Sequence, residues 1–91
     1  MNYKKIIKTD LGEYILSLVT EDFLYYVNEK ESDENGCVIM TRKNGEVVSD
    51  NYFAYGSYVD DMEKVLKNEI ACEFVLESSL SYAKEYFETY S

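Results

Sequence analysis

The chain has 91 residues, 46% of them hydrophobic, and its 18 Asp and Glu against 9 Lys and Arg give a net charge of −9. A chain of this length forms one domain and has enough apolar residues for a core, so we expect a single domain over residues 1–91. Its negative field repels nucleic-acid phosphates and anionic membranes and attracts basic proteins. The charge therefore argues against direct nucleic-acid or membrane binding and favours a basic partner, although acidity also simply keeps small proteins dissolved.

Cysteine usage and the N-terminal residues favour the cytoplasm. Cys37 and Cys72 form no CxxC pair and have apolar neighbours, which is typical of buried, reduced thiols. The N-terminal lysines surround only a two-residue apolar pair, Ile6-Ile7, so the sequence predicts neither a signal peptide nor a membrane-spanning run. We therefore expect a cytoplasmic protein.

The first part of the chain allows two interpretations. Residues 3–19 fit two strands joined by a turn at 9–12, but Asp10 with Glu13 three positions later also matches a capping box that begins a helix. The apolar residues after this turn fit a strand only if both of its faces are buried. Strands are favoured, and the choice between helix and strands for residues 10–28 stays open.

The middle of the chain carries the clearest strand signals. Residues 23–28 are aromatic and β-branched, as strands prefer, and Asn44-Gly45 follows one strand-like run at 37–42 and precedes a second. An Asn-Gly pair between strands favours a type I′ hairpin, in which both central residues have positive φ. A small antiparallel β-meander of three to five strands is therefore predicted over about residues 3–53.

The last third is predicted to form two helices. Asp60 and Asp61 suit the positive end of a helix dipole and are followed by apolar residues at helical spacing, which predicts a helix over about 59–71. A second apolar stripe, with spacings of four and three, predicts a helix over about 78–90. Together with the meander, these elements predict an α+β fold with two C-terminal helices packed on one face of the sheet.

The sequence lacks the residues of most catalytic and metal sites. It has no histidine, which excludes Ser-His and Cys-His nucleophiles and His-containing zinc sites, and it has no P-loop or GxGxxG motif. Residues 31–36 match the acidic start of an EF-hand loop, but Arg42 occupies the twelfth position, where calcium coordination requires a carboxylate. No spacing selects a pair of catalytic carboxylates. We predict no enzymatic activity, no cofactor and no metal.

Tyrosines and carboxylates are the candidate binding residues. Ten of the 91 residues are tyrosine, which is enriched at binding hot spots because it offers a large contact area at small entropic cost. Residues 52–63 combine aromatics with acids, and glutamates recur at every fourth position of 69–77, where a continuous helix would align them. The alternative is that aromatics of this segment, Phe53 and Tyr55 above all, belong to the core. The predicted partner-binding residues are Tyr52, Tyr55, Tyr58, Asp60, Asp61, Glu63, Glu69 and Glu73.

These features predict a small acidic inhibitor that binds a basic, nucleic-acid-binding protein or nuclease and blocks its binding surface. Phage or mobile-element anti-defence proteins of the anti-CRISPR or DNA-mimic type use this strategy, and such a protein would act in the host cytoplasm. Two alternatives stay open. One is an immunity protein or antitoxin that neutralises a basic nuclease toxin; the other is a non-catalytic accessory subunit that buries its tyrosines in a homo-dimer or larger homo-oligomer.

Overall fold

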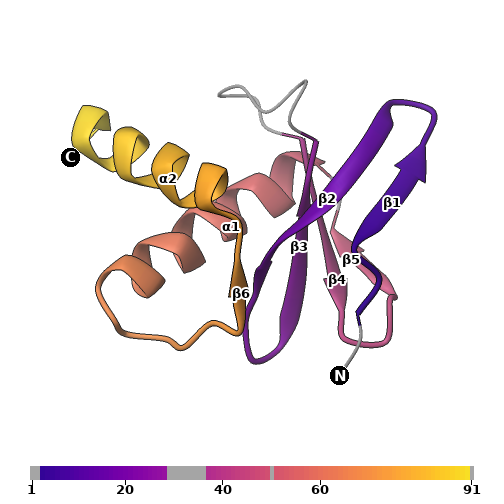
Figure 1. The fold of residues 1–91 in the computed structure, drawn as a ribbon, viewed down its shortest axis with the longest axis horizontal. Helices are drawn as coiled ribbons and strands as arrows, with labels where there is room; N and C mark the ends of the chain where they lie inside the picture. The colour runs from indigo at the N-terminus through magenta and orange to yellow at the C-terminus, as the bar shows by residue number, and fades with distance from the viewer. Residues whose placement is uncertain (1–2, 29–36, 50, 91) are drawn as a thin grey trace.

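A computed structural model describes residues 3–28, 37–49 and 51–90 (Figure 1). Five strands form a curled antiparallel meander in the order β1-β2-β3-β4-β5, and a sixth, short strand pairs with β2. In chain order the elements are β1 (Ile6–Thr9), β2 (Gly12–Val19), β3 (Phe23–Val27), β4 (Val38–Arg42), β5 (Val47–Ser49), α1 (Asn51–Leu66), β6 (Phe74–Val75) and α2 (Glu77–Tyr90).

The α+β class and the antiparallel meander are confirmed, and residues 12–19 and 23–27 form strands instead of a helix. The predicted pair of helices on one face of the sheet is not confirmed. Helix α1 is the one that lies against the sheet, where it contacts β4, whereas α2 follows β6 and has its main contacts with α1 (Figure 1). Within the described part of the chain, α1 is therefore the helix that covers the sheet.

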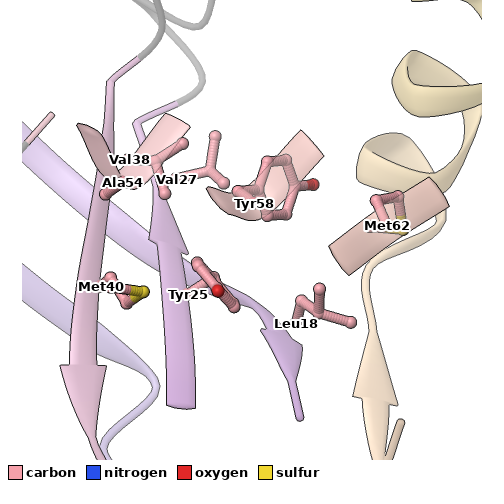
Figure 2. Close-up of a cluster of buried hydrophobic side chains, with 8 residues drawn as sticks. All are labelled: Leu18, Tyr25, Val27, Val38, Met40, Ala54, Tyr58 and Met62. Atoms are coloured by element: carbon pink, nitrogen blue, oxygen red, sulfur yellow. The ribbon is translucent and has the colours of Figure 1, made fainter. Parts of the chain in front are cut away.

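Both faces of β2 and β3 are buried, which explains why these strands are apolar at nearly every position. Side chains on one face pack under α1 and form a first core cluster (Figure 2). Side chains on the opposite face form a second cluster, which residues of β1 help to cover. The first cluster contains Leu18, Tyr25, Val27, Val38, Met40, Ala54, Tyr58 and Met62, and the second contains Tyr14, Leu16, Val19, Leu24, Tyr26 and Cys37.

An irregularity in β2 decides which of its side chains face the helix. Strict alternation would place Tyr14, Leu16 and Leu18 on one face. The pairing of β2 with β3 shifts register between Leu16 and Leu18, and Leu18 joins the cluster under α1 while Tyr14 and Leu16 remain in the other. A β-bulge re-aims side chains in this way. Ser17 faces α1 as well, and its hydroxyl lies 2.9 Å from the Tyr58 hydroxyl.

The β4–β5 hairpin is confirmed, but its turn is not of type I′. Gly45 has a φ of 93°, and Asn44 is not among the described residues with positive φ. The Gly45 N–H donates to the Arg42 carbonyl at 3.0 Å, which closes a four-residue turn that ends in one left-handed residue. This arrangement needs glycine only at position 45. The EF-hand-like segment at 31–36 lies outside the described residues.

Helix α1 begins at Asn51, eight positions before the predicted start. Gly56 disfavours a helix in this segment, because glycine is a poor helix former. A helix here instead buries Ala54, Tyr58 and Met62, which recur every fourth position and are at most 3% exposed. A glycine within a helix costs about 1 kcal/mol, less than the burial of one large apolar side chain contributes.

The same helix ends at Leu66, before the predicted end at residue 71, and Asn68 is the reason. Asn68 has a φ of 59°, in the left-handed region that asparagine tolerates better than most residues. The Asn68 N–H donates to the Val65 carbonyl at 3.1 Å, and the Glu69 N–H donates to the Lys64 carbonyl at 2.8 Å. These two bonds form a Schellman motif, which satisfies the last helical carbonyls and turns the chain away from the helix axis.

Candidate functional site

An acidic cleft lies between the β2–β3 turn and the C-terminal half of α1. Its volume is about 410 Å³, and four of its nine lining residues are acidic while one, Lys64, is basic. We name this hollow the acidic cleft; it is lined by Thr20, Glu21, Asp22, Phe23, Asp61, Lys64, Glu69, Ile70 and Ala71.

Two local structures bring these carboxylates together. In the β2–β3 turn, the Thr20 N–H donates to the Phe23 carbonyl at 3.0 Å, and the Thr20 hydroxyl accepts from the Phe23 N–H at 3.2 Å. This closed turn leaves Glu21 and Asp22 exposed at its tip. On the other side, the Schellman motif at the end of α1 redirects the chain so that Glu69 lines the cleft instead of continuing along the helix.

Asp61 serves the fold as well as the cleft. Its carboxylate Oδ2 accepts a 2.6 Å hydrogen bond from the Tyr25 hydroxyl on β3, which ties α1 to the sheet. Burial, and then the hydrogen bond and negative charge of Asp61, raise the pKa of Tyr25 far above its ordinary value of 10.0. Tyr25 therefore stays a neutral donor across the physiological range, and Asp61 is held in place at the floor of a charged region.

Glu63 is partnered within α1. It forms a 2.7 Å salt bridge with Lys67, one helical turn later, and both side chains are substantially exposed. The contact with Glu63 raises the pKa of Lys67. An exposed pair of this kind is screened by solvent and salt and contributes little to stability. Glu63 is not among the residues that line the acidic cleft.

The aromatic residues of segment 52–58 are partly buried in the core and partly exposed, and the assignment differs from the one predicted from the sequence. Tyr58 was predicted to contact a partner, but it is only 3% exposed and packs in the core under α1, in tilted contact with Tyr25 at 5.7 Å between ring centroids. Phe53 was expected in the core, yet it is 71% exposed, and neighbouring Tyr52 is 75% exposed. Tyr55 is half-buried against the core cluster. Helical geometry explains this result, because position 58 faces the sheet with Ala54 while positions 52 and 53 face away.

The predicted ridge of glutamates at 69–77 does not exist, because α1 ends at Leu66. Glu69 joins the acidic cleft, whereas Glu73 is exposed beside β6, where its N–H donates to the Val19 carbonyl at 3.2 Å. Asp60 is exposed on α1 next to Asp61. Of the predicted set, the structure thus brings Asp61 and Glu69 into one cleft.

Sequence reasoning missed Glu21 and Asp22 as members of this site. They are about forty positions from Asp61, and only the packing of α1 against the sheet places the two segments together. The available signal was an acidic pair between two strand-like runs, which marks an exposed turn but not what the turn faces.

Metal-binding clusters, membrane-spanning helices and cysteines are the remaining features of the described residues that bear on function. No group of three or more Cys, Asp or Glu side chains among the described residues is arranged to hold a metal ion. None of the described helices is long and apolar enough to cross a membrane. Neither Cys37 nor Cys72 forms a disulfide; Cys37 is buried as expected, whereas Cys72 is exposed, contrary to the expectation from its apolar neighbours.

Comparison with protein-family models, with curated proteins and with solved structures finds no match for this chain. The architecture of the described residues therefore defines the class of this protein. The protein is an α+β protein with a curled antiparallel sheet, one helix packed against that sheet, and an acidic cleft at the end of the helix.

Proposed function

We propose that this chain is a non-catalytic inhibitor that binds a basic protein through its acidic cleft and blocks the nucleic-acid-binding surface of that protein. The observation that supports this proposal is the meeting of four carboxylates, from two distant segments, around one hollow whose lining includes a single cation, Lys64. A Lys or Arg side chain of a partner entering this hollow meets several acceptors at once, which gives charge-assisted hydrogen bonds.

The charge of the whole chain supports the same function. A net charge of −9 steers a basic partner toward the protein and speeds association at low salt. A groove that binds nucleic acid is rich in Lys and Arg because it contacts phosphates. The negative charge of this chain therefore attracts such a groove. The specific inhibitor that we propose is a phage or mobile-element anti-defence protein of the anti-CRISPR or DNA-mimic type, which acts in the host cytoplasm. An immunity protein or antitoxin binds a basic nuclease toxin through the same attraction between acidic and basic surfaces, and this alternative function remains open.

The test begins with capture of partners from a host lysate at low and high salt, followed by binding measurements on the purified partner. The double variant Asp22→Lys/Glu69→Lys reverses two charges of the cleft, and Asp61 is left unchanged because it holds Tyr25. The control Glu85→Lys/Glu88→Lys makes the same charge change on exposed positions of α2.

We expect the cleft variant to weaken binding by about tenfold or more at low salt, and the control to lower mainly the association rate by a smaller factor. Wild-type protein should also compete with nucleic acid for the partner. Equal losses of affinity in the two variants would show that binding depends on the overall charge of the chain and not on the cleft. If the wild-type protein retains no basic partner even at low salt, the proposed function is wrong.

A further inference from the structure

Exposed apolar side chains make up part of the surface outside the acidic cleft. The large hydrophobic residues that are exposed within the described ranges come from β1, the β1–β2 turn, β5 and the first turn of α1, and none lines the acidic cleft. They are Ile6, Leu11, Val47, Val48, Tyr52 and Phe53. Two pairs among them lie together, Leu11 with Val47 at one hollow and Tyr52 with Phe53 in ring contact, and adjoining apolar side chains mark an interaction surface more often than scattered ones do.

Part of this surface is hollow. A groove of about 380 Å³ lies where the β1–β2 turn, β5 and the start of α1 meet, and it leads to side chains of β2 and β4. Leu11 and Val47, each 60% exposed, stand at its rim. We name it the apolar groove; its lining among the described residues is Thr9, Asp10, Leu11, Tyr14, Ile39, Val47, Ser49 and Asn51, and one of these, Asp10, is charged.

Directly beside the groove is a protruding aromatic pair. Asn51 lines the groove, and the next two residues on α1 are Tyr52 and Phe53, which we name the aromatic pair. Their rings are in edge-to-face contact, with centroids 5.8 Å apart and planes at 88°, so they form one rigid protrusion. A protrusion and a hollow of matching apolar character therefore sit next to each other on one chain.

We propose that a second copy of this chain occupies the apolar groove, with the aromatic pair of each protomer inserted into the groove of the other. When a protrusion and its complementary hollow are adjacent on one face, a two-fold axis lets both contacts form at once and closes the assembly as a dimer. This inference concerns a different surface from the acidic cleft and does not rest on the proposed function.

The area and the charge both suit a second copy. An aromatic side chain buries about 150–250 Å², so the four rings of a reciprocal dimer contribute roughly half of a standard interface of about 1,200–2,000 Å². Two molecules of charge −9 repel each other least where few charges face the interface, and Asp10 is the one charged residue among the described residues that line the groove. A basic partner, in contrast, finds little to pair with in this groove.

The test measures the mass of the wild-type chain by sedimentation equilibrium from micromolar to millimolar concentration, where we expect twice the 10.6 kDa of one chain. The variant Tyr52→Ser/Phe53→Ser removes the aromatic pair, and Leu11→Glu/Val47→Glu blocks the groove. All four positions are at least 60% exposed, so these changes leave the fold intact. Ile6→Thr is the control, because Ile6 is an exposed apolar residue that does not line the groove.

Each of the two double variants should raise the dimer dissociation constant about a hundredfold, while Ile6→Thr leaves it nearly unchanged. A mixture of the two variants should form more dimer than either alone, because one intact aromatic pair then meets one intact groove. A wild-type chain that stays monomeric at millimolar concentration overturns the proposal. So does a dimer that survives both double variants, or a mixture that dimerises no better than its components.

Discussion

The Tyr58 hydroxyl on α1 lies 2.9 Å from the Ser17 hydroxyl on β2, although 41 positions separate the two residues. The contact depends on the early start of α1, which places position 58 within the helix and against the sheet. Both hydroxyls are buried, so each needs a hydrogen-bond partner, and the pair ties the helix to the sheet at one register. Tyr58 is thus a residue of the fold.

A pair of tyrosine variants tests this assignment. Tyr58→Ala should lower the free energy of unfolding by about 3–5 kcal/mol, because it empties a large buried site. Tyr52→Ala, at a position that is 75% exposed, should change it by no more than about 0.5 kcal/mol. Urea unfolding, followed at a concentration where the chain is monomeric, gives both values. Similar losses in the two variants would contradict the burial described for Tyr58.

The Tyr25–Asp61 hydrogen bond predicts a loss of stability at alkaline pH. Burial and Asp61 raise the pKa of Tyr25 in the folded protein above its ordinary value of 10.0, and burial also raises that of Tyr26. The folded state therefore binds these protons more tightly than the unfolded state, so the contribution is complete below about pH 10 and is lost as the pH rises further.

Tyr25→Phe separates this effect from general alkaline unfolding. The variant cannot ionise at position 25, so its stability should fall less steeply above pH 10 than that of the wild type, with Tyr26 still contributing. The measurement is urea unfolding at a series of pH values. Identical slopes for the two proteins would show that Tyr25 does not titrate with unfolding.

Two glycines should respond in opposite directions to substitution by alanine. Gly56 lies inside α1 with no atom within 4 Å of an added Cβ, so Gly56→Ala should stabilise the protein by about 0.5–1 kcal/mol. Gly45 has open space too, but its φ of 93° is strained for any L side chain, and Gly45→Ala should cost about 1 kcal/mol. Thermal unfolding of both variants provides the comparison. A destabilising Gly56→Ala would mean that residues 51–58 are not helical.

The end of α1 can be tested at Asn68. Asn68→Ala should destabilise the protein by about 1 kcal/mol, because alanine adopts the left-handed conformation less readily, whereas Asn68→Gly should keep or raise stability. Thermal unfolding measures both. If alanine were tolerated as well as glycine, the Schellman motif would not be what ends the helix.

The strands could be predicted from the sequence because their signals are local. Gly12 and Gly45 mark turns, and the runs between them are apolar and β-branched, so the meander follows without knowledge of the rest of the chain. The sequence allowed a strand after Gly12 only if both of its faces are buried, and β2 contributes to both core clusters. The bulge between Leu16 and Leu18 was not predicted, because no residue type requires it.

The boundaries of α1 and the make-up of the acidic cleft could not be predicted in the same way. Gly56 reads locally as a flexible point, and only the burial of Ala54 and Tyr58 against the sheet overrides that preference. The cleft joins Glu21 to Glu69 through tertiary packing, which spacing along the chain does not encode. Asn68 could have indicated the end of α1, because asparagine tolerates the left-handed conformation found there. The apolar spacing through residue 70 instead predicted a longer helix.

Strand β6 has a consequence for the order in which the molecule assembles. Each pairing within the meander joins strands that are neighbours along the chain, whereas β6 pairs Val75 with Leu18, 57 positions away. Because closing a long loop costs more chain entropy than closing a hairpin, the sheet and α1 can form while residues after 70 are still free. The edge of β2 next to Leu18 and Val19 is the last part of the sheet to gain a partner, and until then it is the site at which two folding chains are most exposed to mispairing.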